Sequence, residues 1–151
     1  MAVPSTPIAY HLFKYALGKK LIDLGADVFK LALFTSASNA GTTALTHSGG
    51  TPPLYADLTN EVSNANGYTT GGATVANTWT NSSGTETFGL ANPQWTASGA
   101  GLVFEFGVVY DSTTGYLVGW FYFDSTPTSV TVAAGVQMTV TIDVSGFFSL
   151  A

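Results

Sequence analysis

Apolar residues recur along this chain with two different periods, one before residue 25 and another after it. In the first part they return every three or four positions, which predicts an amphipathic helix over residues 7–24. Thr6 suits the N-cap of this helix, Pro7 its first turn and Gly25 its C-terminal end. The apolar stripe of the helix consists of Tyr10, Phe13, Leu17, Leu21 and Leu24.

After Gly25 the apolar residues alternate with polar ones or form short blocks, as they do in strands. Turns rich in Gly, Asn, Ser and Thr separate these blocks. Residues 36–53 form a longer connection, and loops of such length are often functional. The predicted strands are residues 28–35, 54–62, 73–80, 85–90, 102–110, 116–123, 129–133 and 136–144.

The strands at 102–110 and 116–123 are joined by a short loop that ends in Gly115, which predicts a β-hairpin. Both strands are apolar on both faces, so each face needs a cover from this chain or from another subunit. The last two strands are expected to pair in the same way across a turn at residues 134–135. The side chains expected to point inward from the last strand are Val136, Met138, Val140, Ile142 and Val144.

Short strands with polar turns after a single helix predict a mainly β fold. We expect an antiparallel β-sandwich or jelly-roll-like domain with one N-terminal α-helix. Residues 1–27 would form an N-terminal helical arm and residues 28–151 a single β-sandwich domain. Near its end the chain carries the apolar pair Phe147 and Phe148. We expect this segment to fold back on the body or to insert into a neighbouring subunit, because an apolar terminus is not stable in water.

Charge is scarce and unevenly distributed. Of the 151 residues 9% are charged and the net charge is −5, whereas an average soluble domain is roughly 25% charged. Such an acidic chain does not attract phosphate backbones or anionic membranes, so we expect no nucleic-acid partner and no membrane partner. Low charge with a mean hydropathy of +0.28 favours a protein that buries surface in an assembly. There is no Arg, and the cations are Lys14, Lys19, Lys20 and Lys30.

The candidate catalytic groups do not form a recognised set. The chain has no Cys, and His11 and His47 are far apart in sequence, so we expect no metal site and no cofactor. Glu105 lies in an apolar run, and its carboxyl group should have a raised pKa or a polar partner. We expect a non-enzymatic protein with no catalytic residues. The carboxylates that could form a glycosidase pair are Glu86, Glu105, Asp111 and Asp124.

Several segments follow one another in an order that resembles a known family. Asn60, Glu61 and Val62 are followed by Gly67-Tyr68-Thr69 and by Gly71-Gly72. Two further stretches that belong to the same order of segments lie at residues 30–36 and 92–97. In this order the segments resemble a family of small virion proteins of tailed bacteriophages. The resemblance implies a structural role in the virion and no reaction. The glycines allow positive φ, so this segment is either a fixed turn or a loop that contacts a lattice partner.

These observations together predict a capsid decoration or cement protein. It would bind the major capsid protein or other virion subunits on the capsid surface, as a homo-oligomer in which a trimer is favoured. The side chains expected to contact partners are Phe13, Leu17, Lys19, Lys20, Trp95, Phe147 and Phe148.

Two alternatives are a tail-associated protein of a fibre, knob or baseplate, and a carbohydrate-binding module. The module would use Trp95 and Trp79, because aromatic faces stack on sugar rings, although packing in the core is the other role for them. Trp95 follows a proline and is the better candidate for exposure. Trp120 lies in an apolar strand and is expected to be packed.

Overall fold

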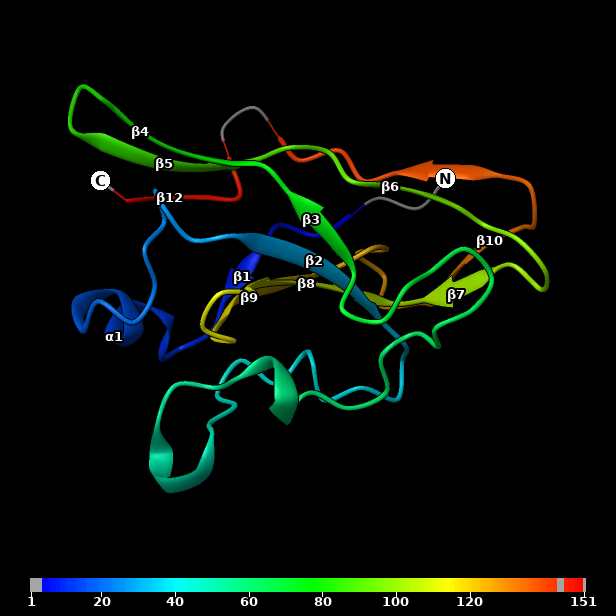
Figure 1. The fold of residues 1–151 in the computed structure, drawn as a ribbon, viewed down its shortest axis with the longest axis horizontal. Coiled ribbons are helices and arrows are strands. Elements are labelled where there is room, and N and C mark those ends of the chain that lie inside the picture. Colours follow the sequence, from blue (N-terminus) through cyan, green and yellow to red (C-terminus); the bar gives the residue numbers. More distant parts are fainter. Residues whose placement is uncertain (1–3, 144–145, 151) are drawn as a thin grey trace.

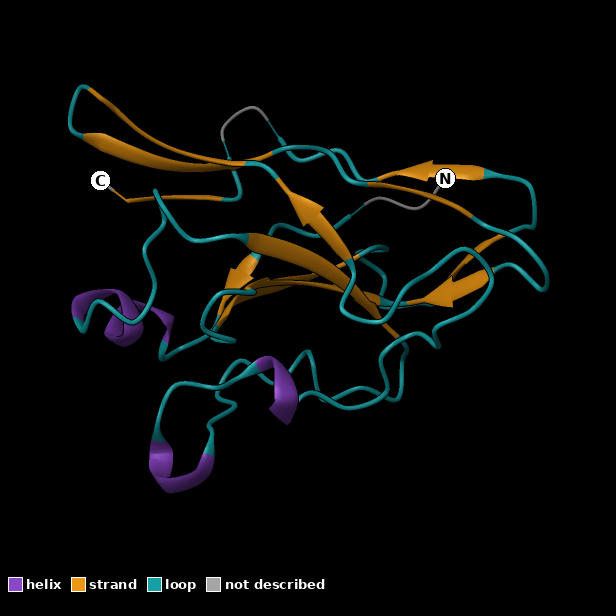
Figure 2. Ribbon diagram, viewed as in Figure 1, coloured by secondary structure: helices purple, strands orange, loops and turns teal. Residues whose placement is uncertain are grey.

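The computed structural model of this protein describes residues 4–143 and 146–150. Its fold is mainly β, with antiparallel sheets and one short α-helix, as the sequence predicted (Figures 1 and 2). Two layers of strands face each other in the manner of a β-sandwich, while the jelly-roll connection stays a prediction. The lower layer in Figure 1 is a five-stranded sheet in the order β1-β9-β8-β2-β3, here called the main sheet.

The main sheet is built around the predicted hairpin. Strands β8 and β9 pair antiparallel, with Val108 opposite Trp120, and β2 pairs along the whole length of β8. A five-stranded sheet thus forms from segments distant in sequence. Its strands are β1 (Ile8–Ala9), β2 (Phe29–Phe34), β3 (Ala73–Val75), β8 (Phe106–Asp111) and β9 (Leu117–Tyr122).

Three smaller sheets complete the two layers. The sheets β12-β5-β4 and β11-β6 lie above the main sheet, and β7 with β10 lies beside its end (Figure 1). A two-residue turn, Ser83-Gly84, closes the β4–β5 hairpin. The strands are β4 (Asn77–Ser82), β5 (Thr85–Leu90), β6 (Gln94–Thr96), β7 (Leu102–Phe104), β10 (Val130–Val132), β11 (Gln137–Thr139) and β12 (Phe148–Leu150).

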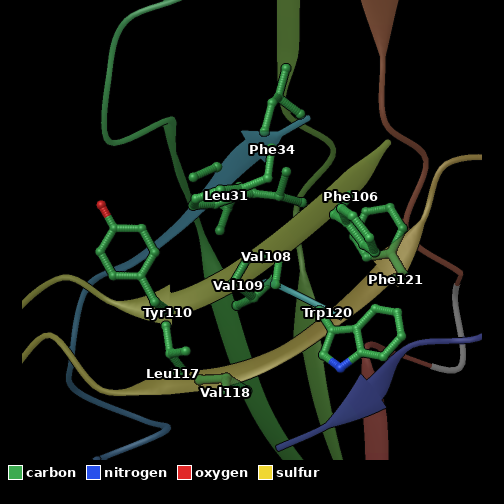
Figure 3. Packing of buried hydrophobic residues seen from close by; sticks show 14 of the residues in the cluster. Leu31, Phe34, Phe106, Val108, Val109, Tyr110, Leu117, Val118, Trp120 and Phe121 are labelled. Atoms are coloured by element: carbon green, nitrogen blue, oxygen red, sulfur yellow. The ribbon is translucent and has the colours of Figure 1, made fainter. Parts of the chain in front are cut away.

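The hairpin of β8 and β9 is buried on both faces, which confirms the prediction for this part of it (Figure 3). The predicted strand 102–110 is divided, because β7 pairs with β10 instead, and Val103 is 49% exposed. On the upper face Phe29 packs against Phe88 of β5 with ring centroids 4.9 Å apart. On the lower face Tyr55 of the loop after β2 stacks on Tyr110, with centroids 4.4 Å apart. Every residue of β8 is buried. The cover for both faces therefore comes from this chain.

The prediction of a helix over residues 7–24 is wrong. The α-helix α1 covers only Phe13–Gly18, and Ile8 pairs with Trp120 in the main sheet. Leu12, and not Thr6, is the N-cap residue. Tyr10 and Phe13 are buried by strand pairing and a short helix, so the apolar spacing was satisfied by a different structure. The described part of the predicted 1–27 arm therefore packs into the same core as the β domain.

The strand predicted over residues 54–62 is also wrong. This segment contains a 3-10 helix, η2 (Tyr55–Asp57), and joins the sheets only through isolated bridges. The loop before it has a second short 3-10 helix, η1 (Ser48–Gly50). The strand predicted over 73–80 is divided at residue 76, where the chain passes from the main sheet to the upper layer.

The last two strands do not pair with each other, so the second predicted hairpin is wrong. β10 pairs with β7, and β11 pairs with β6. The short turn at 134–135 connects two sheets instead of closing one hairpin. Of the side chains predicted to point inward, Val140 is buried, Met138 and Ile142 are half-buried, and Val136 is 49% exposed. Val144 lies outside the described residues.

Candidate functional site

The exposed cations gather on α1 and the turn that follows it. Lys14, Lys19 and Lys20 are exposed, and Tyr15 between them is 53% exposed. The Lys19 ammonium lies 5.6 Å from the centre of the Tyr15 ring, a cation–π contact. Lys30, in contrast, is half-buried in β2. Lys14, Tyr15, Lys19 and Lys20 form a surface that we call the α1 lysine patch.

The phenylalanines predicted to contact a partner lie largely inside this chain. Phe13 and Phe147 are buried, and Phe148 is half-buried. The rings of Phe13 and Phe148 meet edge to face with centroids 5.1 Å apart, which attaches α1 to β12. Leu17 is half-buried beside this cluster. The C-terminal segment thus folds back on the body, and Lys19 and Lys20 are the exposed members of the predicted contact set.

The tryptophans differ from the prediction in one respect. Trp95 is 7% exposed and packs beside Tyr68, so the expectation that it is exposed is wrong. Trp120 is packed as predicted, against Phe106. Trp79 in β4 is 36% exposed. A sugar-binding surface that needs both Trp79 and Trp95 is therefore not present.

A polar cluster lies where the segment of residues 60–72 meets the main sheet. Oε1 of Glu61 accepts hydrogen bonds from the Tyr68 hydroxyl at 2.5 Å and from the Gly71 N–H at 2.7 Å. Oε2 accepts a hydrogen bond from the Tyr55 hydroxyl. The Tyr110 hydroxyl donates to the Gly71 carbonyl at 2.8 Å. We call these five residues the Glu61 cluster.

Burial suppresses acid–base chemistry by the tyrosines of the Glu61 cluster. Burial first, and then the hydrogen bond to Glu61, raise the pKa of Tyr55 and of Tyr68. Burial and the nearby Glu61 charge raise the pKa of Tyr110 to about 12. At neutral pH these hydroxyls stay protonated and act as hydrogen-bond donors. The cluster therefore fixes the chain instead of transferring protons.

The glycines of this segment have the positive φ that the sequence predicted. Gly67, Gly71 and Gly72 have φ of 87°, 94° and 74°. The Glu61 cluster anchors the segment on the main sheet, as the fixed turn requires, while a contact with a lattice partner stays a prediction. Tyr68 and Glu61 were visible in the motif. Tyr55 and Tyr110 were missed, because no local pattern links residues from such distant segments.

The long loop holds a histidine–aspartate pair. Nδ1 of His47 lies 2.8 Å from Oδ1 of Asp57, and Oδ2 of Asp57 accepts the Leu54 N–H at 2.7 Å. A catalytic triad adds a nucleophile to such a pair. In the part of the chain that the structure describes, no hydroxyl is hydrogen bonded to Nε2 of His47. The pair closes the loop. No pattern in the sequence identified Asp57 as the partner of His47.

The carboxylates considered for a glycosidase have separate polar partners. Glu105 is 9% exposed, and its Oε2 lies 3.4 Å from the Ser129 hydroxyl, a polar partner of the predicted kind. Asp111 is fully buried and accepts the Thr113 N–H at 2.7 Å. Burial first, and to a smaller extent the side chain of Asp27, raise the pKa of Asp111. Sequence analysis missed the contact with Asp27, which comes from the segment before β2.

We expect Asp111→Asn to become more stable relative to the wild type as the pH rises from 3.8 towards neutrality. A raised folded-state pKa gives a stabilisation that is fully present below the unfolded value, near 3.8, and is lost as pH rises through the folded value. Asparagine does not titrate, so the variant does not lose stability at this position as the pH rises. Urea unfolding across this pH range measures the difference.

The control for this prediction is Asp124→Asn. Hydrogen bonds from Thr126 lower the pKa of Asp124, so its stabilisation is present above the unfolded pKa and is lost as pH falls. The control should therefore show the opposite trend with pH. Parallel curves for Asp111→Asn and the wild type would contradict the prediction.

A hollow lies between the two ends of the described chain. Its volume is about 620 Å³. Among residues 4–143 and 146–150, no cluster of three or more His, Asp or Glu side chains is placed to hold a metal ion. Within the same residues, no helix has the length and apolar character needed to cross a membrane. The hollow is lined by Pro4, Ser5, Thr6, Pro7, Phe121, Val140, Thr141, Ile142, Asp143, Gly146, Phe147, Phe148 and Ser149.

A search of protein-family models, of curated proteins and of solved structures finds no match to this chain.

Proposed function

We propose that this chain is a non-enzymatic structural protein of a tailed-bacteriophage virion. Its role is that of a capsid decoration or cement protein, which binds the outer face of the assembled shell. Because it would bind the assembled lattice and not free subunits, mass action would stabilise the shell. The order of segments between residues 30 and 110 supports the phage assignment, and the structure gives the 60–72 part of it a physical role in the Glu61 cluster.

The observation that carries the proposal is the α1 lysine patch. The exposed lysines of this chain lie together at one end of an otherwise acidic body. A protein with such polarity can orient itself on an acidic partner, because complementary charge steers the encounter and fixes the docking direction. An acidic face of the major capsid protein is the partner that we propose.

We expect Lys19→Gln/Lys20→Gln to weaken binding to expanded, undecorated shells about tenfold at low salt, since each exposed ion pair contributes about 0.2–1 kcal/mol. The difference should disappear at high salt, where exposed charges are screened. Co-sedimentation of purified protein with shells at two salt concentrations measures both effects.

A matched control changes the net charge equally at a different place. Thr131→Glu/Gln137→Glu also makes the chain more negative by two charges, at exposed residues of β10 and β11. Its binding to shells should equal that of the wild type. An equal loss of shell binding in both double variants would show a general effect of net charge and not a specific role of the α1 lysine patch. If the wild type fails to bind shells at any salt concentration, the decoration role is lost.

A further inference from the structure

Strand β4 leaves one edge of the upper layer open. It is the last strand of the sheet β12-β5-β4 in the part of the chain that the structure describes. Every residue after Asn77 in this strand is exposed. Figure 1 shows the β4–β5 hairpin at the upper margin of the molecule, with β4 on its outer side. The outer edge of β4 is therefore accessible along its length.

The turn of the hairpin determines which backbone groups face outward. Ser83 and Gly84 have φ of 53° and 86°, which is the geometry of a type I′ two-residue turn. Such a turn is closed by a hydrogen-bonded pair, here Ser82 and Thr85. Hydrogen-bonded and non-hydrogen-bonded pairs alternate along the ladder. The N–H and C=O groups of every second residue thus point away from β5, at Asn77, Trp79 and Asn81.

This edge lacks the features that usually prevent strands from pairing with other chains. Those features are charged side chains, prolines, bulges and short length. β4 has the sequence NTWTNS, without charge or proline, and pairs with β5 over six residues without a register shift. An edge of this kind is a template for another strand.

We propose that a second copy of this chain adds its own β4 to this edge, antiparallel and around a two-fold axis at Trp79. The six strands of the two copies then form one continuous sheet. The N–H and C=O of Trp79 pair with those of the same residue in the second copy. Asn77 pairs with Asn81 of the second copy, and the reverse. A strand is able to pair with its own copy in this way because the contact is isologous.

The side chains of β4 are complementary in this register. Trp79, 36% exposed, would be covered by the same residue of the second copy. Asn81 donates one amide hydrogen to Glu86 at 2.5 Å, which leaves its second hydrogen for the other copy. Asn77 donates to the Leu24 carbonyl at 2.8 Å, and its own side-chain oxygen is available as the acceptor. On the opposite face Thr78 lies against Thr80 of the second copy, a favourable cross-strand pair.

The proposal concerns an interaction surface and does not rest on the virion role. It also differs from the trimer expected from the sequence, because a two-fold contact on β4 yields dimers. The α1 lysine patch lies on other residues, so the two surfaces can be tested separately.

Disulfide cross-linking tests the register directly, since the chain has no cysteine of its own. In the proposed register, position 78 and position 80 of the second copy form a non-hydrogen-bonded pair with Cα atoms about 4.5 Å apart. Disulfides need Cα separations of roughly 4.4–6.8 Å. An oxidised mixture of Thr78→Cys and Thr80→Cys protein should give disulfide-linked dimers. Each variant alone should give few, because its cysteines would be diagonal neighbours about 7–8 Å apart.

Sedimentation provides an independent measurement. The wild type should be a dimer, and Trp79→Lys should be a monomer because two lysines would meet at the axis. The matched control Val103→Lys replaces another exposed apolar residue, on β7, and should leave the dimer intact. A monomeric wild type, a Trp79→Lys variant with the wild-type oligomeric state, or equal cross-linking by the single cysteines and their mixture would each overturn the proposal.

Discussion

Replacing Glu61 by alanine should lower the free energy of unfolding by about 3 kcal/mol or more, one of the two largest effects we expect for a single substitution. Glu61 accepts hydrogen bonds from Tyr55, Tyr68 and Gly71, and these donors come from two separate segments. Tyr68 is 3% exposed, so water cannot replace the lost acceptor at its hydroxyl. Its hydroxyl oxygen also accepts the Leu33 N–H at 3.0 Å, which extends the loss to β2.

Urea unfolding followed by tryptophan fluorescence measures this effect. Glu61→Gln should be intermediate, because its carbonyl still accepts while its amide group faces a hydroxyl donor. The control Glu86→Ala removes another carboxylate, which accepts a hydrogen bond from the exposed Asn81 side chain, and should cost less than about 0.5 kcal/mol. A loss for Glu61→Ala no greater than that for Glu86→Ala would mean that the cluster does not stabilise the fold.

The Glu61 cluster shows how far local sequence patterns reach. The motif drew attention to Glu61, Tyr68 and the glycines, and the positive φ of those glycines followed from their residue type. The partners Tyr55 and Tyr110 come from η2 and from β8, and nothing in the spacing of the sequence connects them. The carboxylate therefore had a predictable position in a turn but no predictable function there.

The same limit explains the errors in the fold. The hairpin of β8 and β9 was predicted because its strands are adjacent in sequence and its loop is short. The pairing of β10 with β7 and of β11 with β6 depends on packing between layers, which overrides a turn signal at residues 134–135. The segment before β2 has helical spacing, but Ile8–Ala9 gains more by completing the main sheet. Tertiary pairing decided each of these cases.

Contact residues were hard to predict for a related reason. An apolar side chain such as Phe147 can cover its own core or a neighbour's, and its sequence is the same in both cases. In this structure Phe147 packs in the core of its own chain, with its ring centroid 6.4 Å from that of Phe121. Charged residues have fewer options, because burying an unpaired lysine is costly. For that reason Lys19 and Lys20 are exposed, as residues that contact a partner must be.

Gly72→Ala should be even more damaging than the loss of Glu61, with a cost above about 4 kcal/mol or a failure to fold. A Cβ atom at this position would lie 2.0 Å from the Leu31 carbonyl oxygen and 2.6 Å from the Ala32 Cα. Both atoms belong to the backbone of β2, which pairs on both sides within the main sheet and cannot move away. The φ of +74° at Gly72 adds the cost of left-handed backbone, about 1–2 kcal/mol for a residue with a Cβ.

Alanine substitutions at Gly71 and Gly135 serve as controls. They separate the cost of the steric clash at Gly72 from the cost of its positive φ. Gly71 has a φ of +94°, but a Cβ atom there would meet nothing nearer than the Tyr110 hydroxyl at 3.5 Å. Gly135 has a φ of +82°, and a Cβ atom there would have no other atom within 4 Å. Each should lose only the backbone cost, about 1–2 kcal/mol. Urea midpoints and soluble yield of the three variants give the comparison. If Gly72→Ala were no less stable than Gly135→Ala, the close approach of this turn to β2 would be refuted, and with it the rigid attachment of residues 60–72 to the main sheet.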